Sequence, residues 1–553
     1  MSTDGRVIVF DSYATNIVPS DTNSAADVFV RDMWTGTVER VSLSSSGTQG
    51  NNNSWIPVAS ADGRFVVFRS LANNLVPSDT NAHEDIFLRD RVAGVTTRVS
   101  VSSTGAQANQ DCISPSVSAD GRYIAFESTA SNLVPGDLNN VADIFVHDTW
   151  THQTTAVSVT PAGVTGNLTC RYTSISNDGR YVAFQSSASN LVLGDTNGVT
   201  DIFVRDLTLG MTERVSLGYA GQQVAAACVA PSISGDGHVV SFESAATNLV
   251  PGDTNGYMDV FVRDLVRQTT MRVSVSSTGV EGNGWSGADS GLGFTYSPLS
   301  YDGRVVAFLS AATSLVPGDT GFYWDVFTHD LTTRITEKVS EVTPGQELFI
   351  GSVAAAMSAD GRWVTFTTPD ATVVPGDTNA DWDVFLRDRG TTPPYGYCFG
   401  DGTSGVCPCG NAGSPGRGCQ NSRGTGGGEL IATGAATLSA DSLSFSFTGG
   451  SPTALVLLFQ GAEAEEAAPF GDGLRCVGGL IKRIQARTSA GGFALFPEAG
   501  EPSISARSAI VGDPIPIGAT RHYQAYYRDA DPTFCPAGGT ANSSQAVAVL
   551  WEP

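Results

Sequence analysis

Acidic side chains recur in a loop motif whose spacing could bind a metal ion. In the copy LVPGDTNGYMDVFVRD (Leu249–Asp264), Asp253, Asn255 and Asp259 stand at positions 1, 3 and 7 of a turn. Carboxylate and amide oxygens at this spacing can converge on a hard cation such as Ca2+. The alternative is that the first Asp and the Asn shape the turn, while the second Asp pairs with a neighbouring Arg. The sequence leaves both interpretations open.

The motif has seven copies, so the same prediction applies along most of the chain. Gly321 replaces the Asn of the sixth copy, and Leu138 replaces the Thr of the third. On the metal interpretation the cofactor is a structural Ca2+, and on either interpretation no organic cofactor is expected. The predicted metal ligands are Asp21, Asn23, Asp27, Asp79, Asn81, Asp85, Asp137, Asn139, Asp143, Asp195, Asn197, Asp201, Asp253, Asn255, Asp259, Asp319, Asp325, Asp377, Asn379 and Asp383.

The residues just before the second Asp differ among the copies. The last three copies carry large rings there, and the lengthened connection Gly279–Tyr296 adds another. Clustered rings on an acidic loop face favour a binding patch for a glycan or a protein partner. The alternative is that the rings pack over neighbouring loops or against the C-terminal part of the chain. The predicted ligand-binding residues are Tyr257, Trp285, Phe322, Tyr323, Trp324 and Trp382.

A catalytic set is not recognisable in the sequence. The six histidines are scattered, and His147 and His329 replace the Arg of a repeated VRD strand ending. There is no G-x-S-x-G nucleophile elbow, and the carboxylates repeat in every copy, whereas an active site normally breaks such symmetry. We therefore expect a non-catalytic binding or scaffold protein. The alternative is a hydrolase of glycans or lactones, which requires a cluster of non-equivalent polar residues at the axis of the repeat.

The net charge argues against two classes of partner. The chain has 553 residues, a formal charge of −24 and a sequence pI near 4.5. Such a charge repels phosphate backbones and anionic lipid, so we expect no nucleic-acid binding. A run of about 18 apolar residues is also missing, and we expect no membrane insertion.

A second marker, Asp-Gly-Arg, indicates which elements position the acidic loops. Its copies, one of them Asp-Gly-His, lie 58 residues apart five times and 66 apart once, at Asp4, Asp62, Asp120, Asp178, Asp236, Asp302 and Asp360. Asp-Gly between alternating apolar runs predicts a tight hairpin turn. The following DIFVHD and TTAVSVT runs of one copy predict a third and a fourth strand, and helical periodicity is absent. Four-stranded antiparallel repeats that stack radially predict an all-β fold, a seven-bladed β-propeller.

The predicted strand order has two further consequences. The acidic loops and the connections between blades must lie on one face of the ring, here called the loop face, while the other face holds tight turns. The first copy begins at its second strand, Arg6–Ser12, and the last copy ends at its third, Asp383–Asp388. Unpaired sheet edges accept strands from other molecules, so strand exchange between chains at this open edge is an alternative mode of partner binding.

These repeats resemble a known family. SADGRYIAFES, followed by DIFVRD and a T-G-x-T-x-R-V-S strand, is similar to the TolB-like, WD40-like propeller repeat. The resemblance covers residues 1–390 and implies the propeller fold. The long Asp-Thr-Asn loop departs from the family, as does the Ala or Asn that stands where Pro usually precedes Asp-Gly, so the partners of TolB are not carried over.

Cysteines mark a second domain. A Pro-rich linker, residues 391–397, leads into a Gly-rich, all-β segment, residues 398–553. Its cysteines predict a disulfide framework, and the alternative is a zinc site between Cys398 and Cys419. Cys112, Cys170 and Cys228 occupy equivalent places in the propeller, where one pair could bond. The predicted disulfide cysteines are Cys398, Cys407, Cys409, Cys419, Cys476 and Cys535.

The same segment indicates where the protein resides. Its pieces CFGDG, CPCGN, GDGLRC and YYRDADPTFC resemble a C-terminal module of large secreted bacterial proteins. Together with the disulfides, this resemblance implies an extracellular or periplasmic location. Met1 falls inside a repeat, since MSTDGR matches VSADGR, so we expect the natural start and an export signal to lie upstream.

Overall fold

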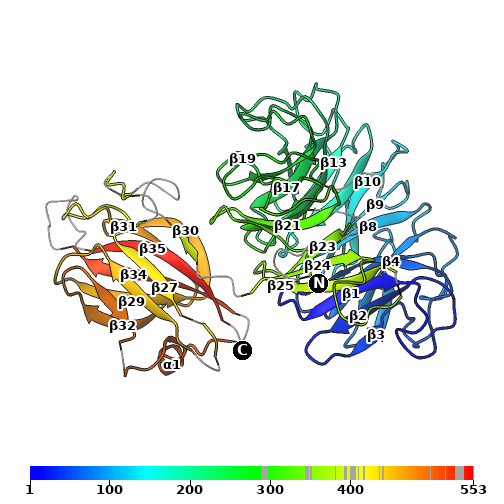
Figure 1. The fold of residues 1–553 in the computed structure, drawn as a ribbon. Helices are drawn as coiled ribbons and strands as arrows, with labels where there is room; N and C mark the ends of the chain where they lie inside the picture. The colour runs from blue at the N-terminus through cyan, green and yellow to red at the C-terminus, as the bar shows by residue number, and fades with distance from the viewer. Residues whose placement is uncertain are drawn as a thin grey trace. The chain divides into compact units, whose positions relative to one another are not determined.

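The chain forms two compact units, Met1–Gly390 and Thr391–Pro553, each described by itself (Figure 1). The computed structural model describes all residues except 288–296, 343–347, 349–350, 380, 391–394, 399–406, 409, 415–416, 435, 439–440, 499, 517–518, 530–540 and 552–553. Within these described ranges, no helix is long and apolar enough to cross a membrane.

The first unit is a ring of seven antiparallel sheets, which confirms the predicted propeller. Blade one holds the three strands β1 (Val7–Ser12), β2 (Asp27–Asp32) and β3 (Val38–Arg40). Four complete blades follow in chain order, β4 (Ser54–Ala59), β5 (Phe65–Ser70), β6 (Asp85–Asp90) and β7 (Val95–Arg98); β8 (Cys112–Val117), β9 (Tyr123–Ser128), β10 (Asp143–Asp148) and β11 (Gln153–Ala156); β12 (Cys170–Ile175), β13 (Tyr181–Ser186), β14 (Asp201–Asp206) and β15 (Met211–Arg214); β16 (Cys228–Ile233), β17 (Val239–Ser244), β18 (Asp259–Asp264) and β19 (Thr269–Arg272).

The last two blades are three-stranded in the described residues. Blade six holds β20 (Val305–Ser310), β21 (Asp325–Asp330) and β22 (Thr336–Lys338), and blade seven holds β23 (Val353–Met357), β24 (Trp363–Thr368) and β25 (Asp383–Asp388). Blade one thus starts at its second strand and blade seven ends at its third, as the repeat predicts. Bridges from Ser286 to Ser310 and from Leu299 to Val306 mark the inner edge of blade six.

Each blade is built from the alternation of apolar residues in its second and third strands. In register, Phe10 faces Phe29, and their rings stack with centroids 5.7 Å apart. The same Phe–Phe pair occurs in all seven blades, at 5.5–6.0 Å. Stacked rings of this kind add to the stabilisation from burial alone.

The Asp-Gly turns join the blades into a closed ring. The residue before each Asp donates its main-chain N–H to its counterpart in the next blade, beginning with Thr3 to Ala61 at 2.9 Å. The last blade completes the circle, because Ala359 N donates to Thr3 O at 2.8 Å. Blade five varies the pattern, since Gly235 O accepts one bond while the N–H of Asp236 makes the next. In Figure 1, β1 and β24 accordingly lie side by side.

Two requirements make glycine necessary in these turns. Gly121 has a φ of +74°, a region that side chains rarely adopt, and a Cβ there would lie 2.4 Å from the ring of Phe65 in the preceding blade. The same holds for all seven turn glycines, from Gly5 beside Trp363 to Gly361 beside Val305. A Cβ added to any of them would lie 2.1–2.9 Å from a side chain of the preceding blade. The turn is therefore both a hairpin and an interface between blades.

The second unit is a β-sandwich-like domain with a single short helix among its described residues. Its sheets have the orders β26-β35-β34-β29-β32, β27-β28-β33 and β30-β31. The elements are β26 (Tyr395–Tyr397), β27 (Glu429–Thr433), β28 (Ser444–Thr448), β29 (Leu455–Gly461), β30 (Glu463–Phe470), β31 (Gly473–Gly478), β32 (Lys482–Thr488), β33 (Ala494–Phe496), α1 (Ile504–Ile510), β34 (Thr520–Arg528) and β35 (Ala541–Leu550). Tyr395–Tyr397, part of the predicted linker, pairs with β35 as an edge strand of this unit and so does not complete blade seven.

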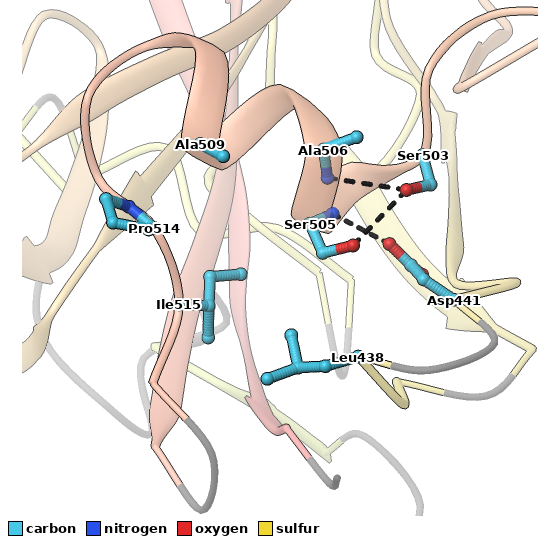
Figure 2. Close-up of a pocket in the computed structure, with 8 residues that line it drawn as sticks. All are labelled: Leu438, Asp441, Ser503, Ser505, Ala506, Ala509, Pro514 and Ile515. Carbon is cyan, nitrogen blue, oxygen red and sulfur yellow. Dashed lines mark hydrogen bonds between the residues drawn. The ribbon is translucent and has the colours of Figure 1, made fainter.

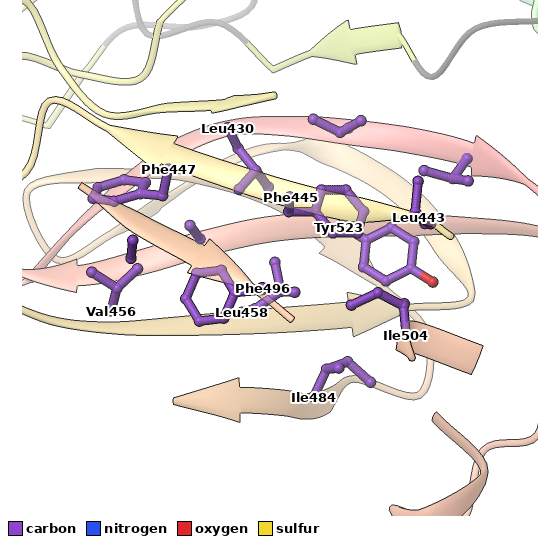
Figure 3. Close-up of a cluster of buried hydrophobic side chains, with 14 of the residues drawn as sticks. Leu430, Leu443, Phe445, Phe447, Val456, Leu458, Ile484, Phe496, Ile504 and Tyr523 are labelled. Carbon is purple, nitrogen blue, oxygen red and sulfur yellow. The ribbon is translucent and has the colours of Figure 1, made fainter. Parts of the chain in front are cut away.

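The core of the second unit lies between the two larger sheets (Figure 3). Phe445 and Tyr523 pack with ring centroids 4.6 Å apart, and Trp551 is fully buried beside them. The hydroxyl of Tyr523 donates to Gln460 Oε1 at 2.9 Å and accepts from Trp551 Nε1 at 3.1 Å, so the buried polar atoms are satisfied.

Two disulfides staple this unit, as predicted. Cys398 bonds to Cys476 and Cys407 bonds to Cys419. The zinc alternative is wrong for these cysteines, because Cys398 pairs with a residue far outside the proposed Cys398–Cys419 cluster. Cys409 and Cys535, also predicted to form disulfides, lie outside the described residues.

The three propeller cysteines are buried free thiols. They begin the equivalent inner strands of three blades, at Cys112, Cys170 and Cys228. The sulfur of Cys112 contacts the hydroxyl of Ser128, and that of Cys170 contacts the hydroxyl of Ser186. Burial raises the pKa of Cys170 and of Cys228 to about 12. The disulfide considered for this set does not form.

Two histidines take the place of a repeated arginine. Arg89, in β6, donates from Nη1 to Thr96 Oγ1 at 3.0 Å, and in β10 His147 Nδ1 lies 2.8 Å from the equivalent Thr154 Oγ1. His147 is 3% exposed, and burial lowers its pKa to about 4, with the charge of His152 a smaller cause. His329 makes the same contact in blade six, and its pKa is likewise lowered to about 4 by burial.

The Asp-Gly turn can be tested by replacing its glycine. We expect Gly121→Ala to destabilise the propeller by about 2–5 kcal/mol, because it combines a left-handed backbone with a clash against Phe65. Gly105→Ala is the matched control, since Gly105 has a φ of +81° but nothing within 4 Å of an added Cβ; the left-handed backbone alone predicts a loss of about 1–2 kcal/mol. Calorimetric melting of both variants measures the difference, and equal losses would contradict the interface role.

The buried histidines predict a loss of stability in acid. The pKa of His147 is about 4 in the folded protein and near 6.5 in the unfolded chain. Its contribution to the free energy of unfolding is therefore complete above pH 6.5 and is lost as the pH falls through about 4. Each histidine contributes at most about 3 kcal/mol to this loss. We expect His147→Arg, which restores the residue of the sister blades, to flatten the fall in melting temperature between pH 7 and pH 4. An unchanged dependence of the melting temperature on pH would show that His147 does not cause the loss of stability in acid.

Candidate functional site

The acidic loops of the loop face have a common frame, shown by blade one. Asp27 Oδ1 accepts from Ser42 Oγ at 2.5 Å, and its Oδ2 accepts from Asn23 Nδ2 at 3.0 Å. Asn23 Nδ2 also donates to Gly50 O, and its Oδ1 accepts from Ala25 N. The Asn therefore fastens the loop to the second Asp and turns its amide nitrogen, rather than its oxygen, toward that carboxylate.

A basic side chain lies between the two carboxylates of this frame. Arg40, in the outermost strand β3, places Nη1 3.1 Å from Asp21 Oδ1 and 2.9 Å from Asp27 Oδ2. Its Nη2 donates to the carbonyl of Ser20 at 3.2 Å. The guanidinium of Arg40 thus lies between the two carboxylates, where the metal prediction places Ca2+. This is the ion-pair arrangement predicted as the alternative to a metal site.

Four further blades repeat this arrangement. The corresponding contacts are Arg98 with Asp79 and Asp85, Arg214 with Asp195 and Asp201, Arg272 with Asp253 and Asp259, and Lys338 with Asp319 and Asp325, at 2.8–3.5 Å. Asn81, Asn197 and Asn255 likewise donate to the second Asp. The basic residue stands 13 positions after the second Asp, and this spacing is the sequence signal that would have identified it.

Blades three and seven differ from the other five. In blade three Ala156 occupies the position of the arginine, while Asp137, Asn139 and Asp143 are retained. Burial raises the pKa of Asp143 to about 6, although hydrogen bonds from Ser158 and Asn139 oppose the shift. In blade seven, Asp377, Asn379 and Asp383 have no fourth strand beside them among the described residues, and both carboxylates are partly exposed.

Most of the predicted aromatic residues are exposed. Phe322 is 76% exposed, and Trp382, Trp285, Tyr323 and Tyr257 are exposed by 54, 52, 50 and 37%. Trp285 is placed beside the blade-five loop, because the next residue, Ser286, donates its N–H to Met258 O at 2.8 Å. These five rings belong to three consecutive blades on one face, and they are called the aromatic arc below.

Trp324 does not belong to the aromatic arc. It is partly buried and packs against the blade core that contains Leu309 and Val326. Its carbonyl accepts from Ser352 N at 2.6 Å, which joins it to the inner strand of blade seven. For this residue the packing alternative is the observed arrangement.

Polar residues of different types stand at one equivalent position of the strand that follows the Asp-Gly turn. Arg69 occupies it in blade two and pairs with Glu84 at 3.2 Å. Asp11, Glu127 and Gln185 accept the main-chain N–H of a residue in the next inner strand, respectively Ile56 at 3.3 Å, Tyr172 at 3.2 Å and Ala230 at 2.9 Å. The residue type at this position therefore differs from blade to blade, and the three acceptors Asp11, Glu127 and Gln185 share one structural task, which is to hold the bulge in the inner strand of the adjacent blade.

A pocket opens on the surface of the second unit (Figure 2). It lies beside α1, where Ser503 caps the helix and Asp441 Oδ2 accepts from Ser505 N at 2.7 Å. Leu438 and Ile515 form its apolar side. The polar groups at this pocket are used in capping the short helix, so the loop face of the propeller is the stronger candidate site.

Comparisons with known proteins come from solved structures. No family model and no curated protein matches the chain. A protein of Agrobacterium tumefaciens assigned as TolB is 15% identical, covering 66% of this chain and 97% of its own, with a TM-score of 0.35. The β-propeller domain of the trilobed protease from Pyrococcus furiosus is 10% identical, covering 69% and 92%, with a TM-score of 0.41.

Dipeptidyl peptidase 4 of Porphyromonas gingivalis is 15% identical, covering 67% of this chain but 48% of its own, with a TM-score of 0.37. At these identities and scores the similarities carry no statement about activity. The propeller assignment rests on the seven sheets, the closed ring of turns and the repeated register described above. The chain is thus a β-propeller protein with a disulfide-bonded second unit, and it is similar to a TolB protein, to the β-propeller domain of a protease and to a dipeptidyl peptidase.

Proposed function

We propose that this protein is a non-catalytic binding or scaffold protein that recognises a protein or a glycan through the aromatic arc. The observation that carries the proposal is the exposure of five large rings on the loops of three consecutive blades. Exposed rings at one place on a protein surface mark interaction sites more often than scattered apolar residues do. Aromatic rings supply much of the energy of protein interfaces and stack on sugar faces.

The acidic loops of the loop face support the same proposal. In five blades their carboxylates are held by a basic side chain and by neighbouring hydrogen bonds, so they act as a rigid frame. A rigid frame limits the ordering of loops on binding, which favours affinity. The residues that vary from blade to blade, including the rings, then determine what is bound.

An extracellular or periplasmic location accompanies this function. Two disulfides in the second unit support it, because disulfides persist in oxidising compartments. A ligand outside the cytosol, such as a cell-surface glycan or an envelope protein, would meet the loop face there.

The aromatic arc can be tested on a glycan array and against secreted proteins of the producing cell. We expect Trp382→Ala and Phe322→Ala each to weaken binding by at least about 10-fold, since exposed anchors of this type dominate interface energies. Trp150→Ala is the matched control, because Trp150 is 66% exposed but lies in the β10–β11 turn on the opposite face.

The two sources of ligand give different results in this experiment. Binding to array glycans that is lost in the arc variants and kept in Trp150→Ala supports a lectin-like role. A secreted protein captured with the same pattern supports a protein partner. Binding that survives both arc substitutions would overturn the proposal.

A further inference from the structure

The blade-three loop keeps its acidic residues and loses the groups that cover them elsewhere. Ala156 stands where blades one, two, four and five have Arg, and Thr165 stands where blades one, two and four have Gln. Leu138, which replaces the Thr that bonds to this Gln in those blades, is 82% exposed. Three side chains have thus been exchanged together, while Asp137, Asn139 and Asp143 are unchanged.

The two carboxylates of this loop are nevertheless buried. Asp137 is 5% exposed and Asp143 is 0% exposed. Asp143 accepts from Ser158 Oγ and from Asn139 Nδ2, each at 2.6 Å, and both donors are neutral. Across the part of the chain that the structure describes, neither Asp forms an ion pair. Burying two unpaired carboxylates is strongly unfavourable unless a cation compensates them.

The sister blades show that this arrangement of carboxylates binds cations. The same two oxygens contact the guanidinium of Arg40 at 3.1 and 2.9 Å, and the ammonium of Lys338 at 3.3 and 2.8 Å. The carbonyl before the first Asp faces the same space, since Ser20 O accepts from Nη2 of the same Arg40 guanidinium at 3.2 Å in blade one. In blade three the equivalent carbonyl belongs to Gly136. An independent cation would therefore meet three oxygen donors already directed at it.

We propose that the blade-three loop binds one Ca2+ ion between Asp137 and Asp143. The donors are oxygens only, which suits a hard cation and is unlike the nitrogen and sulfur sites of zinc. Ca2+ tolerates irregular coordination and can complete its shell with water, whereas Mg2+ demands a near-ideal octahedron. A divalent charge also matches two carboxylates. Asn139 is a positioning residue, because its amide nitrogen faces Asp143 and Gly166 O while its oxygen accepts from Val141 N.

Blade seven does not offer an equivalent site. Asp377 and Asp383 also lack a basic partner from a fourth strand among the described residues, but both are partly exposed, so water can solvate their charges. The proposal thus narrows seven loops of one sequence motif to the single loop where, within the described structure, both carboxylates are buried without an ion pair. It concerns the frame of the propeller and goes beyond the proposed function of the aromatic arc.

Calcium titration of the whole chain tests this site. After treatment with EDTA, we expect isothermal titration calorimetry to give one Ca2+ per chain and the melting temperature to rise by several degrees with CaCl2. Ala156→Arg rebuilds the sister-blade ion pair, so it should abolish the binding and the calcium-dependent shift while raising the melting temperature in EDTA. Ala156→Lys, which introduces the basic residue used by blade six, serves the same purpose if the arginine variant folds poorly.

A gain of binding provides the complementary test. Arg214→Ala combined with Gln223→Thr and Thr196→Leu gives blade four the three side chains of blade three, and it should raise the stoichiometry to two. Asp137→Asn should remove the native site. No Ca2+ binding by the wild type, or full binding by Ala156→Arg, would overturn the proposal, as would tighter binding of Mg2+ or Zn2+ than of Ca2+. Ligand binding by the aromatic arc should be unaffected by Ala156→Arg, so the two proposals fail separately.

Discussion

The Asp-Gly turns are the constraint on which the propeller depends. At each turn a left-handed glycine lies against a side chain of the preceding blade, and a main-chain N–H, from the residue before the Asp or, in blade five, from Asp236 itself, bonds to the next turn. Because the bond from Ala359 to Thr3 joins the last blade to the first, the ring closes through the turns themselves. The three-stranded first and last blades are compatible with a complete ring for this reason. The loops on the opposite face are then free to differ.

Much of this fold could be predicted because the sequence contains seven copies of the same repeat. Asp-Gly between alternating apolar runs predicts the same hairpin in every copy, and a 58-residue period leaves a radial arrangement as the simplest way to bury both sheet faces. The ion pairs of the loops are harder to predict, because Arg40 lies on β3 while Asp21 lies in the loop before β2, and only the pairing of β2 with β3 brings the two side chains together. Residue type alone predicts an exposed Trp324, but its place one residue before β21 turns it toward the core. The Cys398–Cys476 bond could not be chosen, since sequence spacing does not reveal which strands of the second unit adjoin.

Sevenfold repetition also makes exceptions informative. A carboxylate pair with an arginine is the ordinary arrangement in four blades, and this makes the alanine at position 156 meaningful. In the same way, small residues in the early loops give the rings of blades five to seven their significance. The shared geometry of the frame acts as an internal reference, against which a substitution in one blade can be separated from the requirements of the fold.

The three thiols at the start of the inner strands bear on how the two units coexist in one chain. An oxidising compartment that forms Cys398–Cys476 would also offer Cys112, Cys170 and Cys228 as partners for wrong bonds. Thiol exchange needs a thiolate that can reach a disulfide. Once the propeller has folded, burial keeps the three thiols from reaching a disulfide, and a pKa near 12 keeps Cys170 and Cys228 protonated. In an oxidising compartment, folding of the first unit would therefore protect the disulfides of the second from scrambling by these thiols.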